Sequence, residues 1–277
     1  MRPDQLGEPA VEWLALGASL PQNNLRLVLA DIDGVITRGE GQAIDIDVLQ
    51  RLAAINAAAR RDPCIPALAL CTGRQAPYVE LMAQLVGVFL PCIFEHGAGL
   101  FFPTTFLYEF DRRLGPDYAA RLAKLRAALD EPLIQSGRAF VQPGKEATMT
   151  LYPRGALGKT SVDELTEVVE AVVAGVAPEF GVARNVHGVE VRPRGIDKGS
   201  GARRIAALLD LAVEAMAGVG DSDPDLAFLD NCVGFSAAPS NATPKVRQHV
   251  MYVANGAFGD GLLEIVALVE QRNRQSL

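Results

Sequence analysis

The sequence predicts an α/β fold in which a parallel sheet is interrupted by an inserted α+β domain. Three observations carry this prediction. Short apolar runs alternate with helical patterns in the first part of the 277-residue chain, which is typical of a parallel sheet. A middle stretch contains alternating and β-branched segments, which favour antiparallel strands. The alternation of short apolar runs with helical patterns then returns and continues to the end of the chain.

The first three strands are expected in the apolar runs 25–32, 65–71 and 91–94. Asp47 is placed to cap a helix between the first two runs. Pro77 suits the first turn of a helix between the second and third. The order strand, helix, strand, helix, strand indicates a parallel arrangement.

The middle of the chain is expected to place helices on a small antiparallel sheet. Segments 140–152 and 186–192 contain the alternation of half-exposed strands. Ser161 and Glu164 form a capping-box pattern at the start of one helix. A helical stripe of apolar residues marks another: Tyr118, Leu122, Leu125 and Leu129.

After this stretch, Asp197-Lys198-Gly199 opens a helix, and strands are expected at 215–219, 232–235 and 250–253. At roughly 150 residues per domain, the length fits two domains. The bounds predicted are 1–103 with 193–277 for the α/β core, residues 1–24 being a loose helical extension, and 104–192 for the insert.

Composition excludes several classes of protein. The formal charge of −7 argues against nucleic acid or an anionic membrane bound through a broad basic face. No apolar run approaches the roughly 18 residues that span a bilayer, and the N-terminus does not resemble a signal peptide. The cysteines stand singly, which favours free buried thiols in a reducing cytoplasm over disulfides. They are Cys64, Cys71, Cys92 and Cys232.

Four motifs stand at the ends of predicted strands or at a helix start, where open α/β sheets place their sites. They are Asp31-Ile32-Asp33-Gly34, Thr72-Gly73-Arg74, Lys198 beside Gly199, and the segment from Gly220 to Asp225. Singly, each also fits a structural role: a turn, a strand end, a solvated lysine and an acid-rich helix start. The last motif carries three acids within five residues, and a bound cation would relieve their repulsion.

Together and in this order, the motifs resemble the haloacid dehalogenase superfamily of aspartate-nucleophile phosphotransferases. The large insert resembles the type-IIB cap of the trehalose-, sucrose- and mannosylphosphoglycerate-phosphate phosphatases and the Cof-type sugar phosphatases. Further matching segments are Glu95-His96-Gly97-Ala98, Val189-Glu190-Val191-Arg192-Pro193 and Gly259-Asp260-Gly261-Leu262. The resemblance runs from Leu25 to the C-terminus and implies a Rossmann-like core with the insert as a lid.

The resemblance implies a Mg²⁺-dependent phosphomonoester hydrolase that acts through an aspartyl-phosphate on a sugar phosphate or related small phosphometabolite. Asp31 would be the nucleophile, and Asp33 the general acid and then the base. Thr72 and the Gly73 N–H would bind the phosphoryl oxygens, and Lys198 would neutralise charge.

The same resemblance implies the remaining ligands. Mg²⁺ would be held by Asp31, the Asp33 carbonyl and Asp221, with Asp225 as a direct ligand or orienting a bound water. Substrate contacts are expected from Gly73, Arg74, His96, Glu190 and Arg192. A structural role is an equal alternative for His96. In the insert, the candidates for contact with the leaving group are Lys145, Arg154, Arg184, Glu190 and Arg192. Surface exposure is the simpler explanation for each of them singly, and Glu190 and Arg192 rank first because they share one face of an alternating strand.

Three positions depart from the family pattern. Pro224 stands where many relatives have Asn, Ser222 where the trehalose-phosphate branch has a second acid, and Val35 where many have Thr. Two other functions also fit the motifs: a phosphosugar mutase of the same superfamily, and a protein that binds a phosphometabolite without turnover.

Overall fold

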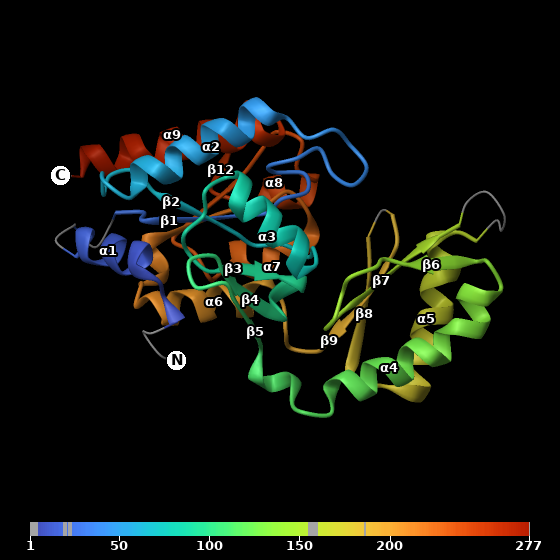
Figure 1. Cartoon of the computed structure of the whole chain (residues 1–277). Helices are drawn as coiled ribbons and strands as arrows, with labels where there is room; N and C mark the ends of the chain where they lie inside the picture. The colour runs from blue at the N-terminus through green and yellow to red at the C-terminus, as the bar shows by residue number, and fades with distance from the viewer. Residues whose placement is uncertain (1–4, 19–20, 22–23, 155–159, 186, 277) are drawn as a thin grey trace. The chain divides into compact units, whose positions relative to one another are not determined.

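The chain folds into two compact units, as a computed structural model that describes residues 5–18, 21, 24–154, 160–185 and 187–276 shows (Figure 1). The core unit comprises Met1–Glu109 and Asp197–Leu277, and the inserted unit comprises Phe110–Ile196. Both boundaries lie a few residues beyond those expected from the sequence. The first does so because residues after 103 continue into a strand of the core unit.

A five-stranded parallel sheet forms the centre of the core unit, with the strand order β12-β11-β10-β1-β2. Its strands are β1 (Leu27–Ala30), β2 (Ala67–Leu70), β10 (Met216–Val219), β11 (Phe235–Ala238) and β12 (Tyr252–Val253). The first four are buried throughout, which explains their continuous apolar runs. The predicted α/β class with a parallel core sheet is confirmed.

The third predicted strand leaves this sheet. β3 (Cys92–Phe94) touches it through a single parallel bridge between Cys71 and Ile93. It then pairs antiparallel with β4 (Gly99–Phe102), and β5 (Leu107–Phe110) completes a three-stranded sheet.

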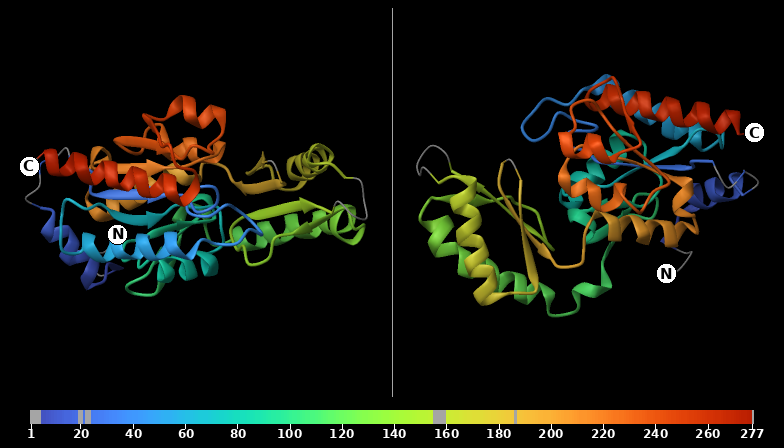
Figure 2. Two further views of the ribbon diagram at one scale, coloured as in Figure 1. Left: turned by 90° about the horizontal axis from the view of Figure 1, so that it is seen from above. Right: turned by 180° about the vertical axis from the view of Figure 1, so that it is seen from behind.

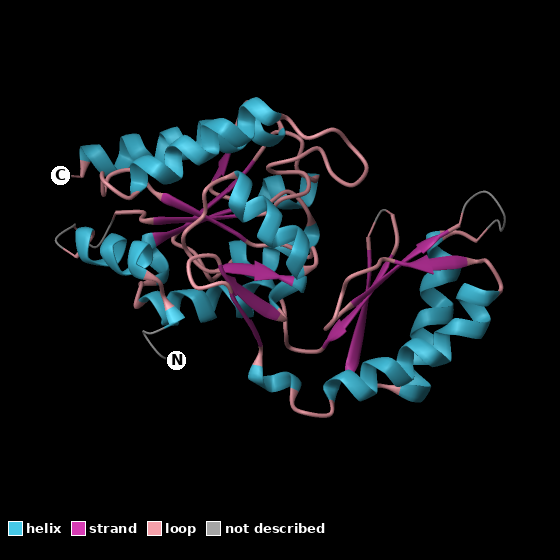
Figure 3. Ribbon diagram, viewed as in Figure 1, coloured by secondary structure: helices cyan, strands magenta, loops and turns pink. Residues whose placement is uncertain are grey.

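Helices cover both faces of the parallel sheet. α2 and α9 lie side by side on one face, and α6 and α7 lie on the other (Figure 3). The helices of the core unit are α1 (Glu8–Leu16), α2 (Ile46–Ala59), α3 (Ala76–Leu85), α6 (Lys198–Leu209), α7 (Leu226–Leu229), α8 (Pro244–His249) and α9 (Phe258–Gln275). Short 3-10 turns occupy Glu95–Gly97 (η2), Val213–Ala215 (η5) and Asp223–Asp225 (η6).

Two local predictions are wrong. Asp45, not Asp47, caps α2, because its side chain accepts hydrogen bonds from the N–H groups of Asp47 and Val48. The strand expected at 232–235 begins only at Phe235, since Cys232 still ends a helical turn by donating its N–H to the Phe228 carbonyl.

The inserted unit is an antiparallel sheet with helices on one face (Figure 2). Its sheet order is β6-β7-β9-β8, from β6 (Ala139–Val141), β7 (Met149–Pro153), β8 (Phe180–Arg184) and β9 (Val189–Pro193). Its helical segments are η3 (Arg112–Leu114), α4 (Tyr118–Leu129), a π-helical turn η4 (Asp130–Gln135) and α5 (Val162–Val176). Ser161 and Glu164 form the predicted capping box, and the predicted stripe on α4 is buried.

The N-terminal extension is helical where the structure describes it. Trp13 of α1 packs edge-on against Phe89, and the Arg26 guanidinium lies 4.4 Å from the centre of the Trp13 ring. Arg26 also donates to the carbonyls of Trp13 and Leu14 near the end of α1. No helix in the described part of the chain is long and apolar enough to cross a membrane. All four cysteines are buried and free.

Asn273 near the end of α9 ties together three segments. Its buried amide accepts from the Leu25 N–H and donates to the carbonyls of Leu25 and Cys64, each at 2.9 Å. We expect Asn273→Ala to lower the free energy of unfolding by about 3 kcal/mol, because buried backbone groups lose their partners. Urea denaturation measures this, with the exposed Gln271→Ala on the same helix as control. Equal stability of the two variants would contradict this role.

Candidate active site

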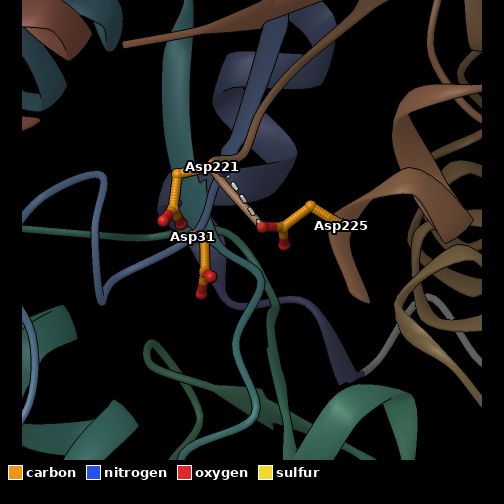
Figure 4. A group of neighbouring side chains, drawn as sticks. All are labelled: Asp31, Asp221 and Asp225. Atoms are coloured by element: carbon orange, nitrogen blue, oxygen red, sulfur yellow. Dashed lines mark hydrogen bonds between the residues drawn. The ribbon is translucent and has the colours of Figure 1, made fainter. Parts of the chain in front are cut away.

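The register of the parallel sheet brings three of the four motifs to one edge. β1 lies between β10 and β2 in parallel register, so the loops after these strands leave side by side. Asp31 follows β1, Thr72 follows β2 and Asp221 follows β10. Figure 4 shows two of these side chains, Asp31 and Asp221, gathered with Asp225. Ligand atoms of these three acids lie within 4.8 Å of one another.

Lys198 is the cation at the centre of this group. Its Nζ lies 2.8 Å from Asp31 Oδ2 and 2.6 Å from Asp225 Oδ1. All three side chains are at least nine-tenths buried. Asp197 places the lysine by capping α6, since its side chain accepts from the Ser200 N–H. The predicted opening of this helix at Asp197-Lys198-Gly199 is confirmed.

Asp225 organises the loop that carries Asp221. Its Oδ2 accepts from the N–H groups of Asp221 and Ser222 and from the Ser222 hydroxyl, each at 3.0 Å. Its Oδ1 takes the Lys198 ammonium. Every carboxylate oxygen of Asp225 is thus engaged, and the residue fixes both a neighbouring acid and the central cation.

Asp221 presents a carboxylate oxygen with no partner. Its Oδ1 is buried and receives no hydrogen bond from any described residue. Gly34 lies directly against this carboxylate, because a Cβ at Gly34 would sit 2.2 Å from Asp221 Oδ2. Gly34 also has φ of +85°, so both space and backbone require glycine here. An unpartnered buried carboxylate oxygen beside a second acid is a fit for a cation.

Burial and mutual repulsion shift the acids. Burial raises the pKa of Asp31 to about 7, against the lowering effect of Lys198. Burial, then Asp225 and Asp31, raise the pKa of Asp221 to about 8. Burial lowers the pKa of Lys198, but Asp225 and Asp31 outweigh it and hold that pKa well above the ordinary value. Lys198 is therefore charged. Its single positive charge does not offset the burial of Asp31 and Asp221, whose pKa values stay raised.

Asp33 is held by Arg74. Arg74 Nε lies 2.6 Å from Asp33 Oδ2, and its Nη2 lies 2.8 Å from Oδ1, which makes a two-point ion pair. Arg74 Nη1 lies 3.3 Å from Glu40 Oε1. The structure thereby links the first predicted motif to the second.

The segments that carry Thr72 and His96 are joined by a backbone hydrogen bond. The Thr72 hydroxyl accepts from the Arg74 N–H, and the His96 N–H donates to the Thr72 carbonyl. A Cβ on Gly73 would sit 2.2 Å from His96 Nε2, so the ring lies against this glycine. His96 has φ of +56°, a left-handed conformation that is uncommon outside glycine.

Glu190 and Arg192 lie in the inserted unit, on β9. They alternate with the buried Val189, Val191 and Pro193, so they share the sheet face opposite those residues. Glu190 accepts from Asn185 and stands opposite Thr150 in the register.

The other inserted-unit candidates differ from one another. Lys145 is buried and donates to the Thr150 hydroxyl at 2.6 Å. Arg184 pairs with Asp163 at an exposed position, and Arg154 is exposed. The surface interpretation therefore suits Arg154 and Arg184 but not Lys145.

Asn241 is a residue of the site that the sequence analysis missed. Its amide donates to the Gly34 carbonyl at 2.9 Å, and its Oδ1 accepts from the Phe258 N–H at 2.7 Å. It thus joins the Asp31–Gly34 turn to the start of α9. A polar residue just past a parallel strand is the signal that could have revealed it, but β11 was expected three residues too early.

Comparisons with known proteins bear on this arrangement. The family model described as haloacid dehalogenase-like hydrolase matches residues 159–266, which include Lys198, Asp221 and Asp225. This part of the chain is therefore similar to the haloacid dehalogenase-like hydrolases. The resemblance predicted from the four motifs is confirmed.

Relatives of this chain by sequence include phosphoglycolate phosphatases. One from Methanothrix thermoacetophila is 41% identical over 78 residues, which are 28% of this chain and 35% of the relative. Another from Methanococcoides burtonii is 22% identical over 251 residues, covering 87% of this chain and 95% of the relative. The first four relatives are matched over 35% to 44% of their lengths.

Solved structures share the fold of this chain. A Thermoplasma acidophilum protein has a TM-score of 0.68 and 18% identity, covering 89% of this chain and 99% of that one. Sucrose-phosphatase from Synechocystis, determined with sucrose and phosphate, has a TM-score of 0.63 and 18% identity over 89% and 98%. These neighbours show that the whole architecture, core and insert together, occurs in other proteins.

The raised pKa values predict how stability depends on pH without metal. Between about pH 4 and pH 8 the folded protein binds more protons at Asp31 and Asp221 than the unfolded chain does. Its free energy of unfolding should therefore fall as the pH rises through this range. Asp221→Asn should flatten this fall in thermal melts in EDTA, whereas the exposed Asp223→Asn should not. Identical pH dependence in the unmodified protein and both variants would contradict a raised pKa at Asp221.

Proposed function

We propose that this hydrolase is a Mg²⁺-dependent phosphatase that transfers the phosphoryl group of a small phosphorylated metabolite to Asp31 and then to water. The observation that carries the proposal is the buried Asp31 carboxylate, paired with Lys198 beside the unpartnered oxygen of Asp221. The phosphatase names of the sequence relatives support the same activity.

In the first step, Asp31 attacks the phosphorus and the bond to the leaving oxygen breaks. Asp31 Oδ1 accepts from the Ile32 N–H and Oδ2 takes Lys198, which holds the carboxylate in one orientation. The Lys198 charge offsets the repulsion between the carboxylate and the incoming phosphate. The Thr72 hydroxyl and the Gly73 N–H would bind the phosphoryl oxygens.

Asp33 would move the protons. As an acid it gives a proton to the leaving oxygen, and as a base it takes one from the water that attacks the phosphorus of phosphorylated Asp31. The second attack breaks the bond between phosphorus and Asp31 and restores the free carboxylate. The ion pair with Arg74 aims the Asp33 carboxylate.

The residues present fit a magnesium ion. Oxygen ligands would come from Asp31, Asp221 and the Asp33 carbonyl. Asp225 suits the indirect role of orienting a bound water, because both its oxygens already accept hydrogen bonds. When bound, Mg²⁺ supplies positive charge that stabilises the phosphoryl group during transfer. Pro224 supplies no side-chain ligand, so the Asn contact of many relatives has no counterpart at that position.

The substrate class proposed is a sugar phosphate or a related small phosphometabolite. Glu190 and Arg192 on the inserted unit would contact the leaving group, and the insert would exclude water as a lid. His96 beside Gly73 would line the core side of the substrate site. The four free thiols support a location in the reducing cytoplasm. The charge of −7 supports a small-molecule partner rather than nucleic acid.

Asp31→Asn should abolish phosphate release, because an amide is not a nucleophile toward phosphorus. The measurement is phosphate release from a panel of sugar phosphates, phosphoglycolate and p-nitrophenyl phosphate with Mg²⁺, and the loss should be at least about a thousandfold. Asp223→Asn is the matched control, since this acid lies in the same loop as Asp221 but pairs with the exposed Lys245.

No hydrolysis of the panel by the unmodified protein would reject the phosphatase. Exchange of phosphate between positions of one sugar, dependent on a bisphosphate, would indicate the mutase. Binding without turnover would indicate the non-catalytic alternative.

Removal of metal should stop the reaction and Mg²⁺ should restore it. Added Mg²⁺ should also raise the melting temperature at pH 8, because it offsets the charges of Asp31 and Asp221. Asp221→Asn should lose most of this thermal shift, with Asp223→Asn again as control. A melting temperature that ignores Mg²⁺ in the unmodified protein would reject the metal site.

A further inference from the structure

Resting on the proposed phosphatase activity, we propose that Glu40 is a specificity-determining residue. It selects a hydroxyl group, and rejects a carboxylate, on the carbon next to the one that carries the leaving oxygen. The preferred substrate is then a phosphate ester of a neutral polyhydroxy alcohol. This choice separates the chain from its relatives named phosphoglycolate phosphatases, because phosphoglycolate carries a carboxylate at that place.

Glu40 lies in a loop that begins beside Asp33. Asp33 and Thr37 form a β-bridge, and the Gly34 N–H donates to the Thr37 carbonyl at 2.9 Å. The Thr37 hydroxyl in turn accepts from the Gly39 N–H at 3.3 Å. The residue directly before Glu40 is therefore tied to the turn that carries Asp33, which keeps Glu40 near this acid.

Glu40 and Asp33 share one guanidinium. Asp33 occupies the side edge of Arg74, through Nε at 2.6 Å and Nη2 at 2.8 Å. Glu40 Oε1 lies 3.3 Å from Nη1, at the end edge. One face of the guanidinium lies over the Tyr78 ring, 4.7 Å from its centre, which helps to hold its orientation. The two acids thus lie at different edges of one oriented cation.

The charge of Arg74 is already balanced. Burial lowers the pKa of Arg74, but its contacts with Asp33 and Glu40 outweigh burial and raise that pKa above the usual range. In the proposed reaction Asp33 is neutral when it gives its proton to the leaving oxygen, and Glu40 then balances Arg74 by itself. A substrate carboxylate at this edge would bring a second negative charge against Glu40. Like charges brought so close together repel, which selects against an anionic leaving group.

A hydroxyl group suits the pair of Arg74 and Glu40. In the proposed reaction the leaving oxygen lies against the Asp33 carboxyl, so a group on the adjoining carbon meets the guanidinium that holds Asp33. A hydroxyl there can donate to the Glu40 carboxylate and accept from N–H groups of Arg74 that Asp33 does not use. A carboxylate can only accept, so it offers Glu40 no proton. The Glu40 side chain is 36% exposed, against 13% for Arg74, which leaves it open to a small substrate group.

The experiment compares three phosphate esters that differ in one group: 2-hydroxyethyl phosphate, ethyl phosphate and 2-phosphoglycolate. At fixed free Mg²⁺, kcat/KM should be at least tenfold higher for 2-hydroxyethyl phosphate than for 2-phosphoglycolate, which corresponds to about 1.4 kcal/mol. Ethyl phosphate has neither group and should fall between the two. If 2-phosphoglycolate or ethyl phosphate is hydrolysed as well as 2-hydroxyethyl phosphate, the inference is overturned while the phosphatase stands.

Glu40→Gln removes the charge and keeps the size of the side chain. It should raise kcat/KM for 2-phosphoglycolate about tenfold and lower it a few-fold for 2-hydroxyethyl phosphate, since both the repulsion and the anionic acceptor are lost. Asp47→Asn is the matched control, because it removes one exposed negative charge at the start of α2. Its preference should equal that of the unmodified protein. An equal change on all three esters in Glu40→Gln would mean that Glu40 only shapes the loop, and would overturn the inference.

Salt provides a second readout that a purely structural role would not move. Salt screens exposed charges, so the preference of the unmodified protein for 2-hydroxyethyl phosphate over 2-phosphoglycolate should shrink as salt is added. The preference of Glu40→Gln should change less. An equal response to salt in the two proteins would contradict a charge effect of Glu40.

A binding measurement separates the inference from the activity. In Asp31→Asn with Mg²⁺, calorimetry should show tighter binding of 2-hydroxyethyl phosphate than of 2-phosphoglycolate, and adding Glu40→Gln should remove most of the difference. Equal binding of both esters to Asp31→Asn would overturn the selection by Glu40. If the unmodified protein releases no phosphate from any substrate, the proposed function itself fails, whatever the binding result.

Discussion

The buried Lys198 ammonium is the interaction on which the rest of the site depends. It lies between Asp31 and Asp225, 2.8 Å from one carboxylate and 2.6 Å from the other, so that its charge offsets both of these buried acids. Asp225 in turn fixes the loop of Asp221 through three hydrogen bonds. Loss of the lysine would therefore leave buried negative charge uncompensated at Asp31 and at the residue that holds the loop of the second acid.

The parallel sheet places the residues of this site side by side, because they follow neighbouring strands. Adjacent strands in register deliver their following residues to one edge, so acids far apart in sequence meet with short loops. Two contacts then lock the loops to each other. Arg74 joins the second motif to Asp33, and Asn241 joins the first motif to the start of α9. Both contacts are made by side chains on loops, while the strands provide the rigid frame.

The sequence predicted the parallel core, the antiparallel insert and the meeting of Asp31, Lys198 and Asp221, because strand ends and helix starts follow from local patterns. It failed where tertiary contacts decide. Aspartate is a common N-cap residue, so Asp47 was a reasonable choice. The helix begins one residue after Asp45, whose side chain accepts from the N–H groups of Asp47 and Val48. Cys232 looks apolar enough for a strand, yet it closes the turn after α7. Because the strand was expected at 232–235 and lies at Phe235–Ala238, Asn241 was not seen to follow a strand end. The pairing of Arg74 with Asp33 could not be predicted either, since it spans 41 residues and depends on side-chain direction.

Charge balance explains how a chain with a formal charge of −7 can suit an anionic ligand. The acids of the site do not form a diffuse negative surface, because cations pair with them. Lys198 pairs with Asp31 and Asp225, and Arg74 pairs with Asp33. Lys198 is buried and shared by two acids. Arg74 retains donor capacity on one edge, next to the more exposed Glu40. The two cations therefore differ in the N–H groups that they still offer to a ligand, and under the proposed function that difference, rather than net charge, would decide which part of a substrate each could bind.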